Sequence, residues 1–427
     1  MLLTARRVWV GLWLLATVLA CLALWLAVRG DLSVVRLWWD ILHWRVGNES
    51  WALLQRTLAL LPADGSDLYQ VVYFEHGIKI SYPPSSLLPM HAAAASCSHC
   101  SAADLATAFT AIGLLFTMVI PAVMAAELLA TAWARRASPG DRTMIVLGVV
   151  ALCAVYYPLV LANVLGQAQA WLNGLFALAF WGFVRRRHVL SGVAIGVMAL
   201  VKPYAALLVL WAALRGHRRL SVAALATIVV GVTMSLAVYG LDSHLGYFQM
   251  AAVVAERGES LYANQSINGL LNRLFLPQDQ IGWVQTAPPP FHPVVAIGTR
   301  VALIVGTVIA LWWPARTRAA GGWLDFAFVS VVMLIASPIG WEHYYPLLLP
   351  LYAMFVADTP ETADARPLYL LMASVVLTGV FLGPVARLES RPFSLLQSYQ
   401  FAGAVLFLAT LAHRIHVSGA RRPRPAA

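Results

Sequence analysis

Polar and ionisable residues recur between long apolar runs of this chain, and these residues could do chemistry. Asp67, in a hydrophilic loop, is an acid of the kind that can act as a general base. Lys202 lies in an apolar run, where inserting a charged group costs about 3 kcal/mol or more and therefore calls for a partner such as a phosphate. The other polar groups are Gly166-Gln167, Asn264-Gln265-Ser266 and Trp341-Glu342-His343. These residue types favour chemistry on a charged, lipid-linked substrate.

The composition indicates that lipid surrounds these residues. The chain has 427 residues, of which 60% are hydrophobic and only 11% are charged. A soluble domain of this length could not bury so much apolar surface. The apolar runs are continuous, which fits helices of about 20 residues and excludes a barrel of alternating strands. We therefore predict an all-α polytopic membrane protein.

The distribution of positive charge predicts the orientation in the membrane. The net charge is +10, and only two of the 29 lysine and arginine residues are lysines, Lys79 and Lys202. Arginines in short loops between spans are typical of cytoplasmic loops, whereas a nucleic-acid partner would need one contiguous basic face. The clusters are Arg6-Arg7, Arg135-Arg136, Arg185-Arg186-Arg187, Arg218-Arg219, Arg316 with Arg318, and Arg421-Arg422. We expect a bacterial plasma-membrane protein with both termini cytoplasmic and no nucleic-acid partner.

The apolar runs predict a bundle of about 12 transmembrane helices. Arginines flank residues 189–214 on both sides, so we expect two short helices that meet at Lys202-Pro203, where proline breaks the helix. The other spans are predicted at residues 8–28, 108–133, 144–161, 170–184, 221–239, 294–313, 323–336, 345–356, 367–381 and 400–412.

The remaining segments complete the predicted organisation. Residues 1–416 form a single membrane domain with two large extracytoplasmic loops, about 30–102 and 241–293, and residues 417–427 form a disordered cytoplasmic tail. In the first loop, tryptophans recur beside arginines over residues 36–56, which predicts an amphipathic helix in the membrane interface.

The four cysteines fall into two groups. Cys21 and Cys153 lie in apolar runs and are expected to be buried and inert. Cys97 and Cys100 frame a Cys-Ser-His-Cys segment in the first outer loop. A zinc site needs about four ligands and no second pair lies nearby, so a loop disulfide is the expected state.

The order of the polar motifs resembles glycosyltransferase family 87, membrane enzymes of GT-C architecture that include mannosyl- and arabinosyltransferases. The resemblance rests on Asp67-Leu68-Tyr69, Tyr82-Pro83-Pro84, Gly166-Gln167, Lys202-Pro203, Asn264-Gln265-Ser266 and the segment from Ser337-Pro338 to His343. It implies a GT-C-like bundle, a polyprenyl-phosphate sugar as donor and transfer on the extracytoplasmic face. It also implies that Asp67 is the catalytic base and that His343 belongs to a second active-site element. The Cys-Ser-His-Cys segment has no counterpart in this resemblance.

These assignments give a hypothetical mechanism. Asp67 takes a proton from an acceptor hydroxyl that attacks the anomeric carbon, with inversion. Lys202 and His343 stabilise the departing lipid phosphate. The residues expected to contact substrate are Gln167, Asn264, Gln265, Tyr82 and Glu342. The sugar is expected to be a hexose such as mannose, the acceptor a glycolipid or glycan, and no cofactor is expected, while metal dependence stays open.

Two other classes share several of these features. A transporter or flippase can also combine many spans, a broken helix and an intramembrane lysine, although no inverted repeat is evident here. A polysaccharide polymerase would be expected to use arginines of the outer loops, such as Arg257 and Arg273. Turnover of a lipid-phosphate sugar by purified protein without a gradient would separate a transferase from a transporter.

Overall fold

The computed structural model describes residues 3–61, 67–97, 99–281, 288–362, 365–388 and 392–420. Asp64, the neighbour of Asp67 in the first loop, lies outside the described residues, as do Arg421 and Arg422. The named elements of the described residues are all helices. One isolated antiparallel bridge also pairs Asn264 with Trp341.

The helices are mostly α-helices, with short 3₁₀ or π-helical turns between some of them. In chain order they are α1 (Ala5–Val28), α2 (Val34–Leu42), α3 (Glu49–Ala59), η1 (Gln70–Glu75), η2 (Pro84–Leu87), α4 (Leu88–Ser96), α5 (Ala102–Leu129), α6 (Ala132–Arg135), α7 (Pro139–Val155), α8 (Tyr157–Val164), α9 (Gln169–Val184), α10 (His188–Val201), η3 (Pro203–Ala205), α11 (Ala206–Leu214), α12 (Arg218–Arg257), α13 (Ile267–Phe275), η4 (Gln278–Gln280), α14 (Pro293–Trp312), η5 (Pro314–Arg316), α15 (Trp323–Ala336), η6 (Glu342–Leu347), α16 (Leu348–Ala357), α17 (Arg366–Gly379), α18 (Gly383–Ala386), η7 (Phe393–Ser398) and α19 (Tyr399–Ala420).

The helices confirm an all-α membrane protein but not the number of spans. Among the described residues, 5 helices are long and apolar enough to cross a membrane, or 6 if the bent pair α7 and α8 forms one span. A further group of apolar helices has only 10–17 residues: α9, α10, η3 with α11, α15 and α17. Because these are shorter than a span of about 20 residues, the total of 12 stays a prediction.

The broken pair predicted at Lys202-Pro203 is present. Lys202 ends α10 with extended backbone angles (φ −139°, ψ 102°), as expected for a residue before proline. The other ends of α10 and α11 also lie close together. The rings of His188, at the start of α10, and His217, after α11, are 5.7 Å apart. Thus α10 and α11 form a hairpin that enters and leaves at one end of the molecule.

The predicted second outer loop is largely helical. The helix predicted to stop at residue 239 continues as α12 to Arg257, with a break at Gly240 (φ +73°). Glycine adopts this left-handed backbone without the penalty of a side chain. The C-terminal tail was also placed too early, since α19 runs past residue 416 to Ala420.

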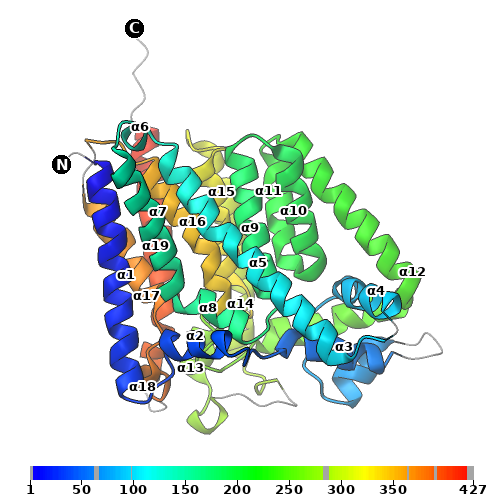
Figure 1. Ribbon diagram of the computed structural model, residues 1–427. Helices are drawn as coiled ribbons and strands as arrows, with labels where there is room; N and C mark the ends of the chain where they lie inside the picture. The colour runs from blue at the N-terminus through cyan, green and yellow to red at the C-terminus, as the bar shows by residue number, and fades with distance from the viewer. Residues whose placement is uncertain are drawn as a thin grey trace.

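The two ends of the bundle differ in character. Figure 1 shows the start of α1, α6 and the end of α19 at one end, and α2, α3, α13 and α18 at the other. Arg215 forms a buried ion pair with Asp325 (Nε–Oδ2 2.6 Å) near the first of these ends. At the other, α2 lies across the bundle and leaves Val35 and Trp39 exposed, in agreement with the expected interfacial helix.

The cysteines match their predictions with one exception. Cys97 and Cys100 form a disulfide, and Cys153 is buried. Cys21 is exposed on α1 and not buried as expected, because it faces away from the neighbouring helices.

Candidate active site

A cavity of about 800 Å³ opens among segments that are far apart in the sequence. Its walls come from residues 49–56, 73–82, 157–167, 254–263 and 339–344, together with Lys202 at the tip of the α10–α11 hairpin. The ionisable side chains that line it are Glu49, Arg56, His76, Lys79, Lys202, Glu259, Glu342 and His343. A cavity of this size accommodates a small-molecule or lipid-linked substrate.

Lys202 presents a buried amino group to this cavity. The residue is 8% exposed, and its Nζ donates a hydrogen bond to the hydroxyl of Tyr344. The same Nζ lies 3.7 Å from the ring centroid of Tyr344 and 5.5 Å from that of Tyr82, so aromatic faces surround it. Within the described residues it forms no ion pair with a carboxylate. A buried ammonium group with this environment favours an anionic ligand.

A tight turn fixes the first wall of the cavity. Gly166, after α8, has φ +63°, and a side chain there would meet the carbonyl oxygen of Gly47 at 2.1 Å. This close approach allows the backbone N–H of Glu49 to donate to the carbonyl of Leu165 (3.0 Å). Only glycine tolerates both the left-handed backbone and the close approach to Gly47. Gly166 therefore allows the turn after α8 to lie directly against the start of α3.

Gln167 extends this connection into the cavity. Its Nε2 donates to Oε2 of Glu49 (2.7 Å), and its Oε1 accepts from Oγ of Ser50 (2.8 Å). Ser50 in turn lies 2.9 Å from the hydroxyl of Tyr82. Gln167 and Tyr82 therefore belong to one hydrogen-bonded wall, and Gln167 orients the carboxylate of Glu49.

Glu49 and Glu259 have raised pKa values. Burial on the cavity side raises the pKa of Glu49, although the residue is exposed at the mouth, and the hydrogen bond from Gln167 opposes this. Burial also raises the pKa of Glu259, which is 5% exposed and paired with Lys79 (2.9 Å). The charges of Lys79 and Glu259 largely cancel each other. Lys202, which also lines the cavity, has no carboxylate partner of this kind within the described residues.

Glu342 and His343 form the deepest polar part of the lining. Burial raises the pKa of Glu342 to about 8, and the hydroxyl of Tyr157 donates to its Oε1 (3.4 Å). Burial and the charge of Lys202 hold the pKa of His343 well below its usual range, so the imidazole is neutral at pH 7. Asn173 fixes this segment by donating to the carbonyl of His343 (3.0 Å).

Asn264 and Gln265 do not line the cavity. The side chain of Asn264 donates to the carbonyl of Glu259 (2.8 Å) and accepts from the backbone N–H of Gly340 (2.9 Å). Gln265 donates to the carbonyls of Tyr262 (2.6 Å) and Gln397 (2.7 Å). Both amides brace the loops behind the cavity wall, and neither is free to contact a sugar in this structure.

Asp67 also lies outside the cavity lining. Its Oδ1 accepts a hydrogen bond from the backbone N–H of Tyr69 (2.8 Å), and its carboxylate lies against Gly246 of α12, where an added Cβ would be 2.0 Å from Oδ1. The structure therefore brings five of the eight expected site residues together: Tyr82, Gln167, Lys202, Glu342 and His343.

The comparisons with known proteins identify the family. The model of glycosyltransferase family 87 matches residues 80–338, which is more than half of the chain. The chain belongs to glycosyltransferase family 87. No curated protein and no solved structure matches it. Family membership and the apolar helices together make it a membrane glycosyltransferase.

The family 87 match covers only part of the cavity lining of this glycosyltransferase. Tyr82, Gln167 and Lys202 lie within the matched residues, whereas Glu342 and His343 follow them and Asp67 precedes them. The match gives a range and no residue roles, so the expected roles of all six residues stay predictions.

Sequence reasoning missed several residues of this cavity lining. Glu49 lies at the start of a helix between Asn48 and Ser50, where an acidic residue is common, so nothing in its local sequence distinguishes it. Lys79 and Glu259 meet across 180 positions of sequence. A signal did exist for Lys79, since it is the only other lysine in the chain, and for Tyr344, which directly follows His343.

Proposed function

We propose that the cavity transfers a hexose, such as mannose, from a polyprenyl-phosphate donor to a glycolipid or glycan acceptor on the extracytoplasmic face. The observation that carries this proposal is Lys202, a buried lysine at the cavity wall that forms no carboxylate pair among the described residues and would be stabilised as a cation by a bound anion. A lipid phosphate supplies the missing negative charge, and its isoprenoid chain remains in the surrounding membrane.

In this proposal Lys202 stabilises the leaving group. As the anomeric carbon is attacked, negative charge grows on the donor phosphate, and a fixed ammonium group in a site of low dielectric lowers the barrier. The neutral His343 lies beside it and can donate a hydrogen bond without adding a second buried charge. Glu259 also lines the cavity, and its Oε2 is buried without a hydrogen-bond partner within the described residues.

Asp67 is the proposed general base, on the resemblance, and Glu49 is the alternative that already lies in the cavity. Catalytic hydrogen bonds are often absent from a ligand-free structure and form only with substrate, so the distance of Asp67 from the cavity does not exclude it. Its action requires the carboxylate to leave Gly246. Glu49 needs no such movement, because Gln167 already orients it.

The donor class can be tested with purified full-length protein in lipid nanodiscs. We expect wild type to transfer radiolabelled mannose from polyprenyl-phosphate mannose to a membrane lipid extract without any ion gradient. Lys202→Met should lower kcat/KM for the donor by about 10²-fold or more, the effect of removing one fixed stabilising group. Arg136→Met, which removes an exposed charge at the other end of the molecule, should have no effect. Unchanged kcat/KM in Lys202→Met would reject the phosphate site.

The base can be identified in the same assay. Asp67→Asn should abolish transfer while donor binding and protein yield stay as in wild type, whereas Glu49→Gln should retain transfer. The reverse pattern would assign the base to Glu49. Loss of general-base catalysis typically costs about 10²–10⁴-fold, so the two variants are readily distinguished.

A further inference from the structure

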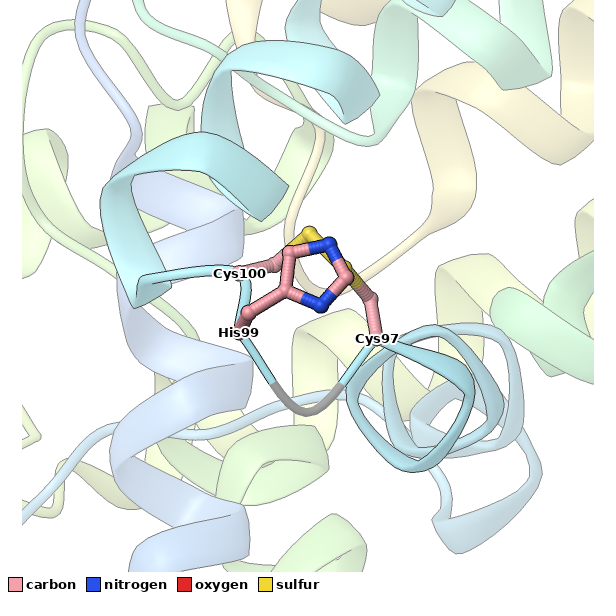
Figure 2. Close-up of side chains that lie close together, drawn as sticks. All are labelled: Cys97, His99 and Cys100. Atoms are coloured by element: carbon pink, nitrogen blue, oxygen red, sulfur yellow. A yellow bond between two sulfur atoms is a disulfide. The ribbon is translucent and has the colours of Figure 1, made fainter.

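A second cluster of reactive side chains lies outside the cavity, in the turn between α4 and α5. Figure 2 shows the Cys97–Cys100 disulfide with the ring of His99 beside it. The Nε2 of His99 lies 3.5 Å from Sγ of Cys97, and the three potential ligand atoms are all within 4.8 Å of one another. His99 is exposed and both cysteines are partly exposed, so solutes can reach the cluster. Ser98 lies outside the described residues.

The disulfide adds little to the stability of this turn. It joins residues only three positions apart, and the constraint a disulfide places on the unfolded chain grows with the length of the loop it closes. Non-covalent bonds already shape the turn, because the backbone N–H of Cys100 donates to the carbonyl of Cys97 (3.1 Å). A capping box between Ser101 and Asp104 fixes the start of α5 independently. The turn and the start of α5 therefore have hydrogen bonds of their own besides the disulfide.

The separation of His99 and Cys97 matches that of two metal ligands, and the two sulfurs must move apart on reduction to complete the set. Tetrahedral Zn²⁺ holds sulfur at about 2.3 Å and imidazole nitrogen at about 2.0–2.1 Å, which places two such ligands about 3.6 Å apart. The 3.5 Å between His99 Nε2 and Cys97 Sγ agrees with this separation. Two thiolates and one imidazole are soft ligands, which suit Zn²⁺ or Cu⁺ and leave one position open to water.

We propose that Cys97, His99 and Cys100 form a redox-dependent binding site for a thiophilic metal ion. A dithiol reductant attacks the disulfide through a mixed disulfide, gives two electrons and two protons to the cysteines and is itself oxidised to a disulfide. The metal ion then displaces the two thiol protons and binds both sulfurs and the imidazole. In the oxidised protein the sulfurs are joined to each other and the site is closed to metal.

The test uses full-length protein in nanodiscs, with Cys21 and Cys153 replaced by serine so that only the pair remains. After reduction and removal of the reductant under anaerobic conditions, we expect one Zn²⁺ per chain, measured by competition with a chromophoric chelator. Bound Zn²⁺ should protect both thiols from a thiol reagent. Co²⁺ in place of Zn²⁺ should give the charge-transfer absorption of sulfur ligands. The oxidised protein should bind neither ion.

Substitutions assign the ligands. Cys97→Ser and Cys100→Ser should each abolish binding. His99→Ala should weaken binding by more than about tenfold, because losing a residue that only supports a ligand already costs about 10–100-fold in metal affinity. His43→Ala, which removes another exposed histidine, is the control and should bind as the parent. A disulfide that resists reduction in the folded protein would overturn the proposal. So would reduced protein that binds no more Zn²⁺ than Cys97→Ser, or unchanged affinity in His99→Ala.

Discussion

The buried carboxyl of Glu342 should make stability depend on pH. Burial raises its pKa from 4.5 to about 8, so the folded protein holds this proton over a range where the unfolded chain has released it. The stabilisation is therefore complete below the unfolded pKa and is lost as pH rises through about 8. We expect Glu342→Gln to remove this dependence. The difference in melting temperature, variant minus wild type, should therefore be more positive at pH 8.5 than at pH 5.5. Melting curves of wild type and variant at the two pH values measure this difference, with Glu256→Gln as the control. The same difference at both pH values would contradict a raised pKa of Glu342.

Single residues were predictable where the sequence made them chemically unusual. Lys202 and His343 were found because a charge in an apolar run and a polar group at the end of a span need partners, and both line the cavity. Glu49 and Glu259 were not found, because their importance comes from contacts with Gln167 and Lys79 that no local pattern encodes. Asn264 and Gln265 were assigned to substrate for a similar reason: an amide that braces a loop and one that binds a sugar look alike in sequence.

At the level of helices and turns, the contact at Gly166 should control the shape of the cavity wall. Gly166→Ala places a Cβ 2.1 Å from the carbonyl oxygen of Gly47 and strains a left-handed backbone, which alone costs about 1–2 kcal/mol. The start of α3 must then shift and carry Glu49 with it. We expect a lower melting temperature and a raised KM for the donor. Gly216→Ala is the matched control, since Gly216 has φ +73° but no atom near an added Cβ; it should lose stability and keep its KM. Equal KM values in both variants would show that the wall does not depend on this contact.

The contact between Asp67 and α12 allows a second test on a helix. Gly246→Ala puts a Cβ where the Asp67 carboxylate now lies, 2.0 Å from its Oδ1, so the carboxylate must move. If Asp67 leaves this position in order to act as the base, the variant should transfer sugar at least as fast as wild type. Gly11→Ala, in the open on α1, is the control for the general effect of alanine in a helix. A large fall in kcat at normal protein yield would mean that Asp67 is required where it is.

For the molecule as a whole, the arginine clusters predict which end faces the cytoplasm. Positive-inside orientation places the end with α6, the start of α1 and the end of α19 in the cytoplasm, and the end with α2 and α3 outside. In protein whose native cysteines are replaced by serine, an impermeant maleimide should label His43→Cys in intact cells. It should label Arg219→Cys only after permeabilisation, since both positions are exposed. The opposite pattern would place the cavity on the cytoplasmic face.

The positions of several helices could be predicted from sequence more closely than the number of times the chain crosses the membrane. Continuous apolar runs located α1, α14 and α15 to within a few residues, because hydrophobicity and helix length carry the signal. Hydrophobicity alone does not distinguish a short helix enclosed by its neighbours from a crossing in lipid, so the assignment of α9 and α17 as full spans stays a prediction. The helical outer part of α12 was missed because its polar residues resemble those of a loop.

The hairpin of α10 and α11 has a consequence for how the protein is made. Its arms of 14 and 9 residues are about 21 and 14 Å long, less than the roughly 30 Å of the hydrocarbon core, and its tip carries the charged Lys202. Such a segment has no stable place in bare lipid as it leaves the ribosome. Its principal partner, α12, is synthesised after it. The hairpin therefore depends on a later helix for much of its packing, so the cavity wall that Lys202 forms is complete only after α12 has been made.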